Sequence, residues 1–542
     1  MRWAGASPRP HLAPRSGIVG TVADRAQDYR FPLRTSWFVL RGGTSTPIRS
    51  AMQFPFSPRL CAVVLGGLLL VASRLVVVAQ PATERAPATK KVAAAPILSR
   101  ADALADLATF AQRLREEAAY LDLHQAKPFA AIESLRQRLP DQIAVAEFTR
   151  ELQKILSPIG DCHSGVSSKA FDAEPGLWLP FRLAVAQGGI VAVKRENTAF
   201  VDPDFPYLVA LDGRPLKDWF DAALRYAPVG STSQNLSQSV SGIRRLDILR
   251  RDLGLPARRT VEVTFANSAG ATKTITLPGR TAFSSLAKIS LGESRRIGDL
   301  GYLRLPAMDD KLIPEAKKRM EEFRDTAGLI IDVRGNGGGS YGLMRTLFGY
   351  FRPADAGPFV CNIAAYRLAP NFRANHIEYR PTYRRTWSGW SPADLVAIDA
   401  AVANFKPRFN LPAGQFSEWH FMLLRHEDFQ YHYDKPVIVL CDEGCFSASD
   451  GFLAAFAELP HVTLMGVASR GGSGSSRTVA LPRSKINFKL STMASFRPNG
   501  ATFEGHGVAV DVVAQPPPDD FITRKDSVLD QAVRRLRSAR PN

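Results

Sequence analysis

The spacing of apolar residues predicts a helical region in the first part of the chain that has a clear pattern. From residue 98 to about 156 apolar side chains recur at helical spacing, and no strand-like stretch interrupts them; examples are Leu104, Leu107, Phe110 and Leu114. Such spacing is typical of helices with one buried face. We therefore expect an N-terminal helical domain over 98–172, which carries the polar turn Gly160-Asp161-Cys162-His163-Ser164.

The pattern changes over 175–282, where short β-branched stretches replace the helical spacing. In their midst, residues 207–211 are followed by an Asp-Gly turn and a second apolar start at 214–216. A strand, a tight turn and a restart are typical of antiparallel sheets. We expect a small β-rich module here, with further strands at 190–193, 260–264 and 274–277.

Strand and helix patterns alternate over 283–542. The apolar strands have no polar positions between their apolar ones, which indicates burial on both faces and a largely parallel sheet. The predicted strands and helices are, in chain order, 328–333, 341–351, 436–441, 448–459 and 462–467. The predicted fold class is therefore α/β, an α+β multidomain chain whose last part is an α/β core.

One long segment interrupts this alternation. Residues 365–434 are rich in Tyr, Arg, Trp and Pro, with one clear helical stretch near 392–405. Insertions of this length within a domain often form lids or the walls of binding sites.

The start of the chain has the pattern of an export signal. The apolar run 60–79, interrupted by Ser73 and Arg74, follows a basic start at Met52 and ends in small residues. We expect 52–79 to be a secretory signal peptide and 1–51 to be a non-native upstream extension. The alternative is an uncleaved membrane anchor, in which Arg74 would be costly. A linker follows at 80–97, and both interpretations predict a periplasmic or secreted protein.

Composition and charge exclude several classes of protein. With 542 residues, 45% of them hydrophobic and 22% charged, the chain can fill ordinary cores in two to four domains. Five cysteines are too few for a disulfide scaffold and lack the spacing of a zinc site. The net charge is +18, but ten Arg and two Asp in 1–79 contribute +8 of it. We expect no nucleic-acid partner.

Ser447 lies where a predicted strand meets a predicted helix. Unpaired backbone N–H groups at a helix start can bind an oxyanion, which favours a nucleophile at this position. A serine followed three residues later by Asp450 is also an ordinary helix cap. On this motif alone the cap is the better interpretation.

The turn after the strand at 328–333 contains three consecutive glycines, Gly337-Gly338-Gly339. It matches neither a phosphate loop nor a dinucleotide-binding turn. A tight turn before a helix would explain one glycine. Three in a row predict that another segment of backbone approaches closely.

His163 and Glu504 are each ordinary when considered alone, a structural histidine and a turn carboxylate. Acyl transfer, however, needs a hydroxyl nucleophile, an imidazole to take its proton, a carboxylate to orient the imidazole and backbone donors for the oxyanion. Ser447, His163, Glu504 and the glycine-rich turn together supply these four parts.

In this order the segments resemble the C-terminal processing peptidases, and specifically their tricorn-like branch. The resemblance covers about 98–537 and is strongest after Gly301. The motifs are Asp332-x-Arg334-x-Asn336-x-Gly338-Gly339, Ser447-Ala448-Ser449-Asp450, Pro498-Asn499-Gly500, Gly507-Val508-x-x-Asp511 and the tail 525–532. The resemblance implies a core similar to those of ClpP and crotonase, and it implies that 175–282 is a PDZ-like domain.

The resemblance also implies roles for individual residues. In one branch the base is a lysine after the nucleophile helix, but this chain has no lysine there before Lys485. The tricorn-like branch takes its base from a histidine ahead of the PDZ-like domain, which is His163 here. Ser447 is then the nucleophile, Glu504 the orienting carboxylate, and the backbone N–H groups of Gly337 or Gly338 and of Ala448 the oxyanion hole. No cofactor and no metal are implied.

Cys162 departs from the resemblance, because tricorn-like enzymes have a serine before the histidine. Thiols are weak donors, so either Ser164 substitutes, or the auxiliary hydrogen bond is weakened, or Cys162 has a redox role. A disulfide of Cys162 with Cys445, one of Cys441 with Cys445, and a reactive thiol near His163 are three further hypotheses.

The leading function is an exported serine endopeptidase that hydrolyses peptides or proteins through an acyl-enzyme on Ser447. The main alternative is a catalytically inactive family member that binds a peptide or a hydrophobic ligand, for which the aromatic insertion 365–434 would be suited. A weaker alternative, acyl-CoA chemistry, would need a nucleotide pocket, and no motif indicates one. The partner is thus a peptide or protein substrate, with a membrane tether through 60–79 as an option and no signal for an oligomeric state.

Overall fold

The structure is a computed structural model that describes residues 96–283, 285–370, 380–427 and 430–538. These residues belong to one compact unit, Ala93–Asn542. The predicted extension 1–51, the signal or anchor 52–79 and most of the linker 80–97 lie outside the described residues. Among the described helices, none has the length and hydrophobicity needed to cross a bilayer.

The helical region consists mainly of three helices, as the apolar spacing predicted. They are α1 (Arg100–Glu117), α2 (Pro128–Arg138) and α3 (Val145–Leu156), with the short α4 (Lys169–Asp172) after them. Ser99 caps α1 by accepting a hydrogen bond from the N–H of Asp102. The expected absence of strands was wrong, since β1 (Ile97–Ser99) pairs with β2 (Gln142–Ala144). Three residues are too few to show an alternating pattern.

The helical region has no separate hydrophobic core. Its buried face, including Phe110 and Leu107, packs against Phe488 of β19 (Asn487–Ser491), far along the chain. β19 pairs with β18 (Ser476–Ala480) on one side and with β3 (Gly165–Ser167) on the other. This antiparallel pairing fixes the turn that precedes β3, which contains His163, against the last third of the chain.

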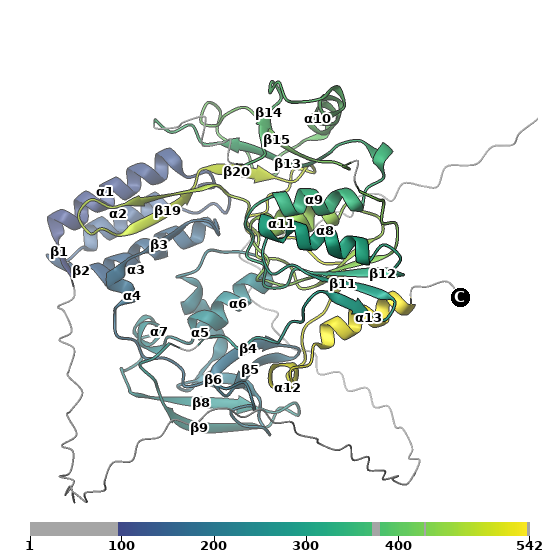
Figure 1. The fold of residues 1–542 in the computed structure, drawn as a ribbon. Coiled ribbons are helices and arrows are strands. Elements are labelled where there is room, and N and C mark those ends of the chain that lie inside the picture. The colour runs from purple at the N-terminus through teal and green to yellow at the C-terminus, as the bar shows by residue number, and fades with distance from the viewer. Residues whose placement is uncertain (1–95, 284, 371–379, 428–429, 539–542) are drawn as a thin grey trace, which may run out of the picture. The chain divides into compact units, whose positions relative to one another are not determined.

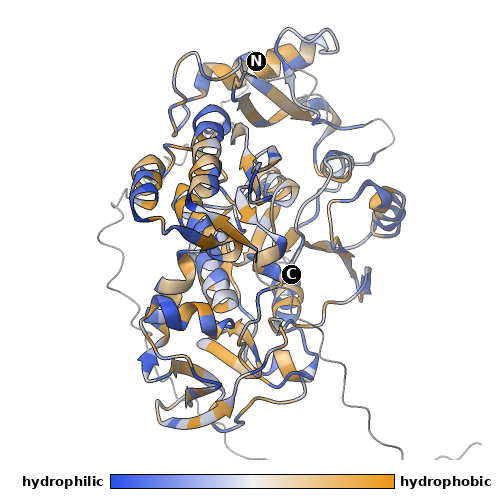
Figure 2. Cartoon of the chain, turned by 90° about the vertical axis from the view of Figure 1, so that its left-hand side faces the viewer, coloured by the Kyte–Doolittle hydropathy of each residue, from blue (hydrophilic) through white to orange (hydrophobic). Residues whose placement is uncertain are grey.

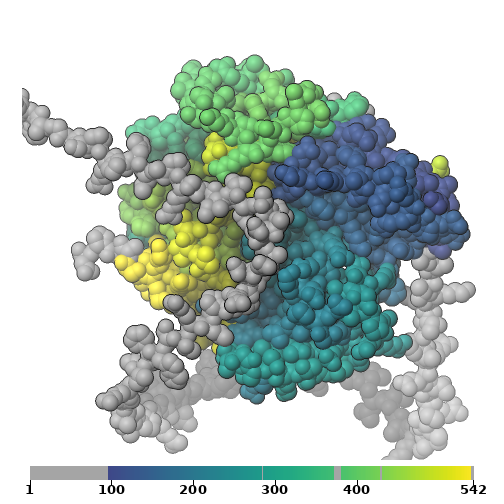
Figure 3. All heavy atoms as spheres, turned by 180° about the vertical axis from the view of Figure 1, so that it is seen from behind, coloured from purple at the N-terminus to yellow at the C-terminus, as the bar shows by residue number. Residues whose placement is uncertain are grey.

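The β-rich module forms a sheet with the strand order β4-β5-β6-β8-β9 and a short β7 beside β6. These strands are β4 (Arg182–Ala186), β5 (Gly189–Val193), β6 (Tyr207–Leu211), β7 (Arg214–Pro215), β8 (Thr260–Ala266) and β9 (Thr272–Pro278). The helices α5 (Leu216–Leu224), α6 (Thr232–Gly242) and α7 (Leu246–Asp252) pack against them around the fully buried Trp219. On the face drawn in Figure 3 the helical region, purple to blue, lies between this teal module and the green insertion.

The core sheet has the order β10-β11-β12-β16-β17-β21, and it is parallel except for β10. Its strands are β10 (Arg295–Ile297), β11 (Leu300–Arg304), β12 (Gly328–Asp332), β16 (Val437–Cys441), β17 (Val462–Gly466) and β21 (Val512–Val513). The predicted α/β class is confirmed, because helices cover both faces of the sheet (Figure 1). They are α8 (Ile313–Glu322), α9 (Gly342–Tyr350) and α11 (Ala448–Phe456) on one face and α13 (Ser527–Ser538), which follows α12 (Asp520–Thr523), on the other.

Successive residues of the central strands point to opposite faces of this sheet. Leu329 and Ile331 pack under α9 and α11, whereas Ile330 packs under α13. All three are completely buried. Burial on both faces explains why these strands read as continuous apolar runs. In Figure 2 the strands at the centre of the molecule are largely hydrophobic, while the helices carry both hydrophobic and hydrophilic residues.

The segment 365–434 contributes two of the four strands of a second sheet. β13 (Phe359–Tyr366) lies between β15 (His420–Leu424) and β20 (Met493–Phe496), with β14 (Tyr383–Arg384) at the edge. The predicted helix is α10 (Pro392–Asn404), whose first turn is closed by a capping box of Ser391 and Asp394. The sequence pattern alone missed these strands; β13 pairs with β20, far along the chain, and β14 has only two residues.

The glycine-rich turn lies as close to other backbone as its composition predicted. A Cβ atom on Gly338 would lie 2.4 Å from the carbonyl oxygen of Phe446, and one on Gly339 would lie 2.1 Å from that of Met308. Both residues also have positive φ angles, 92° and 142°. Gly338 therefore packs against the loop before α11 and Gly339 against the segment after β11, and neither position has room for a side chain.

This packing predicts a difference between two substitutions within one turn. Gly339→Ala should lower the free energy of unfolding by about 2–4 kcal/mol, because the new methyl group meets backbone that cannot move aside. Gly337→Ala is the matched control, since a Cβ atom on Gly337 would meet nothing within 4 Å and its φ angle is not positive. It should change the free energy by less than about 1 kcal/mol. Equal denaturation midpoints for the two variants would contradict the close packing.

Candidate active site

Ser447 occupies the N-cap of α11, at the end of the loop that follows β16. Its backbone has φ 62° and ψ −118°, a conformation that is costly for a residue with a side chain. Strain of this kind amounts to about 1–3 kcal/mol and is typical of functional sites. The backbone N–H of Ser447 donates to Asp450 Oδ2 at 2.8 Å, which supports the turn.

The structure brings His163 and Ser447 together. The Nε2 atom of His163 lies 3.1 Å from the Oγ atom of Ser447, within hydrogen-bonding distance. The imidazole stacks on the ring of Phe446, with 4.3 Å between the ring centroids and 28° between their planes. The residue before the nucleophile thus holds the ring of the base candidate from one side.

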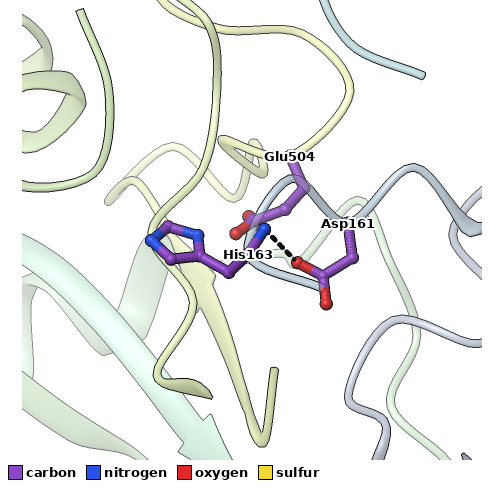
Figure 4. Close-up of side chains that lie close together, drawn as sticks. All are labelled: Asp161, His163 and Glu504. Atoms are coloured by element: carbon purple, nitrogen blue, oxygen red, sulfur yellow. Dashed lines mark hydrogen bonds between the residues drawn. The ribbon is translucent and has the colours of Figure 1, made fainter. Parts of the chain in front are cut away.

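Asp161 fixes the backbone of the His163 turn, a role that the sequence did not assign. Its Oδ1 atom accepts from the N–H of His163 at 2.9 Å, drawn in Figure 4, and from the Oγ of Ser491 at 2.7 Å. Its Oδ2 atom accepts from the N–H of Ser491 at 3.2 Å and from the hydroxyl of Ser164. The Asp-x-His spacing was a weak signal for a side-chain turn, but its partner in β19 is 330 positions away.

Glu504 lies beside the imidazole, completely buried. A carboxylate oxygen of Glu504, one of Asp161 and a ring nitrogen of His163 lie within 4.8 Å of one another (Figure 4). The Oε1 atom of Glu504 accepts from the N–H of Ser473 at 2.7 Å. Its Oε2 atom and the Nδ1 atom of His163 are both buried without a hydrogen-bond partner. Each of these two atoms is the natural partner that the other lacks, since a neutral imidazole can donate from Nδ1 to a carboxylate.

Burial sets the protonation of this pair. Desolvation raises the pKa of Glu504 to about 8, and the charge of Asp161 acts in the same direction. Desolvation lowers the pKa of His163 well below its usual value, and the positive charges of Arg380, Lys489 and Arg470 lower it further. The imidazole is therefore neutral at pH 7, the form that can accept a proton from a hydroxyl group.

Two backbone N–H groups next to Ser447 have no hydrogen-bond partner among the described residues, those of Gly337 and Ala448. The N–H of Gly338 donates to Asn336 Oδ1 at 3.0 Å. The carbonyl of Asn336 accepts from the N–H of Phe446 at 3.0 Å and so ties the two turns together. Of the two glycines that the resemblance offered, Gly337 has the available donor.

Asp450 holds the neighbouring loop as well as the nucleophile turn. One carboxylate oxygen accepts from the hydroxyl of Ser469 at 2.5 Å and from the N–H of Gly471 at 3.1 Å. Burial raises the pKa of Asp450 to about 7. The residue after this loop segment, Gly472, leaves space for the His163 ring, because a Cβ atom there would lie 3.1 Å from Nδ1.

The disulfides considered from the sequence are not formed. Cys162, Cys441 and Cys445 are all free and buried. The thiol of Cys445 donates to the carbonyl of Val333 at 3.0 Å, and that of Cys441 points to the carbonyl of Val467 at 3.5 Å. Burial raises the pKa of Cys162 to about 12, which argues against a reactive thiolate there. Ser164 binds Asp161, so its hydroxyl supports the base through the backbone turn.

Asp161, His163 and Glu504 are also residue types that bind metal ions, and their ligand atoms are close enough to share one. Both oxygens of Asp161, however, accept hydrogen bonds from protein donors, as does Oε1 of Glu504. Only two unpartnered atoms remain, fewer than the three or four protein ligands of most zinc sites. The donor set fits a hydrogen-bonded side-chain array better than a metal centre.

Comparisons with known proteins also point to a peptidase. Residues 299–514 match the sequence model of peptidase family S41. The structure of mature CPAF complexed with lactacystin has a TM-score of 0.58 at 17% identity, and the match covers 81% of this chain and 98% of that one. A CPAF mutant has a TM-score of 0.59 at 17% identity, with 82% and 99% covered. No curated protein sequence matches the chain.

The CPAF structures show the fold over most of the chain, and the family model supports a peptidase over the part that it matches. The resemblance to C-terminal processing peptidases, read from the sequence motifs, is confirmed. That match covers residues 299–514, and for the rest of the chain the comparisons show the fold alone.

Proposed function

We propose that the chain is a serine endopeptidase that cleaves peptides or proteins through an acyl-enzyme on Ser447. The observation that carries the proposal is the 3.1 Å contact between Ser447 Oγ and His163 Nε2. A nucleophile and a base in hydrogen-bond contact, beside unpartnered backbone donors, are the parts that acyl transfer requires.

In the proposed first step, His163 Nε2 takes the proton of Ser447 as Oγ attacks the carbonyl carbon of the scissile bond. The carbonyl π electrons move to oxygen, and the oxyanion accepts hydrogen bonds from the N–H groups of Gly337 and Ala448. The imidazolium is stabilised by ionised Glu504. The C–N bond then breaks as His163 gives its proton to the leaving amine, and a water molecule releases the acyl group by the same steps in reverse.

The β-rich module supports a peptide substrate. β4 is an edge strand of its sheet, α6 packs beside it, and one carbonyl of β4, that of Leu183, already accepts from the N–H of Ala287 at 2.8 Å. A peptide can add to such an edge as an extra strand, and PDZ domains bind in this way. We propose that this PDZ-like module aligns the chain to be cut.

The cellular location is also a proposal. The sequence of 52–79 supports export to the periplasm or secretion, with a membrane tether through 60–79 if the segment is retained. The peptidase site needs no bound cofactor in this proposal.

Removal of either member of the Ser447–His163 pair should abolish activity. We expect Ser447→Ala and His163→Ala each to lower the turnover of a cleaved peptide by roughly 10⁴-fold or more, and the double variant to lose little beyond either single one, because the two residues act as a unit. A fluorophosphonate that reacts with serine nucleophiles should label the wild type on Ser447 and leave Ser447→Ala unlabelled. A folded wild-type protein that is neither labelled nor active would favour the alternative of a ligand-binding protein.

The pH dependence should report on Glu504. Activity requires ionised Glu504, whose pKa is raised to about 8, together with neutral His163, whose pKa is lowered. Hence kcat/KM should fall as the pH decreases through about 8, while protonation of His163 contributes only at much lower pH.

Glu504→Gln is the matched control for this profile. It should lower kcat and remove the decline near pH 8, because the amide does not titrate. A decline that persists unchanged in Glu504→Gln would assign it to another group, such as Asp450 with its pKa of about 7. Circular dichroism at each pH verifies that the fold is retained.

A further inference from the structure

Three cationic side chains surround the proposed catalytic pair without an acidic partner. They are Arg380, Arg470 and Lys489, and among the residues that the structure describes none forms an ion pair with a carboxylate. They come from three different segments: the insertion, the loop after β17, and β19. Three cations beside a nucleophile with no carboxylate partner call for an explanation, because each of them leaves a positive charge uncompensated near the site.

Arg470 and the imidazole of His163 both contact the ring of Phe446. Its guanidinium carbon is 4.7 Å from the centroid of the Phe446 ring, and His163 stacks on the same ring with centroids 4.3 Å apart. The backbone N–H of Arg470 donates to the carbonyl of Cys445 at 2.9 Å, which fixes the residue next to the nucleophile turn. The side chain is half-buried and remains in contact with solvent.

Arg380 reaches the loop on which the imidazole rests. Its two terminal nitrogens donate to the carbonyls of Ser473 at 3.0 Å and Gly474 at 2.6 Å. Gly474 borders the base, since a Cβ atom there would lie 3.4 Å from Cβ of His163. The acceptors of Arg380 are neutral, so its charge is oriented but not compensated.

Lys489 approaches from the strand that anchors the His163 turn. It pairs with Gly165, two residues after His163. Its side chain shares a face of β19 with Ser491, which binds Asp161. Unlike Ser491, Lys489 is exposed to solvent. All three cations are close enough to lower the pKa of His163.

Three carboxylates of the site lie deeper and are occupied. Asp161, Asp450 and Glu504 are at most 3% exposed, and each accepts hydrogen bonds from protein donors. A substrate that enters from solvent would therefore meet the half-buried and exposed cations before it meets the buried carboxylates. An incoming carboxylate can pair with these cations, whereas an incoming ammonium group is repelled.

We propose that the substrates of this site are polypeptides with acidic side chains close to the scissile bond, and that Arg380, Arg470 and Lys489 select them. The inference rests on the proposed function and specifies its substrate class. Charge selection of this kind acts on the encounter and on the register of the bound chain.

The test begins with the purified full chain and a mixed peptide library whose cut sites are identified by mass spectrometry. Asp and Glu should be enriched within three residues of the cut. Matched peptides that differ only as Glu, Gln or Lys at the enriched position then measure the effect. We expect kcat/KM to be roughly tenfold higher for Glu than for Gln and lower again for Lys, since each exposed pair contributes about two- to fivefold.

Substitutions assign the preference to particular residues. Lys489→Gln should reduce the Glu-to-Gln ratio of kcat/KM about two- to fivefold, and Lys489→Glu should reduce it further. Lys318→Gln is the matched control, because Lys318 is an exposed lysine on α8 and does not belong to the three cations; its ratio should equal that of the wild type. Added salt should reduce the wild-type ratio, because exposed charges are screened over about 8 Å at physiological ionic strength.

The outcomes separate this inference from the proposed function. Cleavage with no acidic enrichment, or a Glu-to-Gln ratio near one, would overturn the inference and leave the peptidase intact. No cleavage of any peptide overturns the inference in every case. If Ser447 also fails to react with a fluorophosphonate, the proposed function is overturned with it.

Discussion

The hydrogen bond between His163 and Ser447 imposes the main constraint on this fold, because its two ends lie 284 positions apart in the sequence. A helical region that moved independently of the α/β core could not maintain a 3.1 Å contact. The helical region instead shares its hydrophobic core with the last third of the chain. Its helices pack on β19, and β3 extends the same sheet within a few residues of His163. The antiparallel pairing and the shared apolar core thus fix the distance between His163 Nε2 and Ser447 Oγ.

Burial has a second effect at the site, on charge. An ionised carboxylate removed from water is unfavourable unless donors surround it. Asp161 has such donors for both oxygens, whereas Glu504 has a partner for Oε1 and none for Oε2. Burial and the charge of Asp161 raise the pKa of Glu504 to about 8, and the unpartnered Oε2 atom leaves this carboxylate able to take up a role toward His163. A carboxylate with every lone pair satisfied by backbone would have nothing left to offer an imidazolium.

The sequence predicted the α/β core and the contact between His163 and Ser447. It did not predict the strands and hydrogen bonds that depend on segments far apart in the chain. Continuous apolar runs identify β12, β16 and β17, since these strands are buried on both faces. The three glycines at 337–339 indicated a close backbone approach, which the structure confirms. By contrast, β13 of the second sheet pairs with β20, and the role of Asp161 depends on Ser491. No local pattern contains these partners. The free cysteines were equally unpredictable, because only the fold shows which carbonyls their thiols reach.

The two interpretations of Ser447 from sequence, helix cap and nucleophile, turn out to describe one arrangement. Asp450 accepts the backbone N–H of Ser447, as a capping box requires. That bond helps to hold Ser447 at φ 62°, a conformation that its side chain disfavours. Gly338 packs against the same turn, because a Cβ atom there would lie 2.8 Å from Cβ of Ser447. The cap and the glycine-rich turn thus support the strained conformation in which the Ser447 hydroxyl faces His163. The hydrogen bond that caps α11 therefore also holds the nucleophile candidate in place. The cap and the glycine-rich turn support Ser447 from different sides, so each is needed.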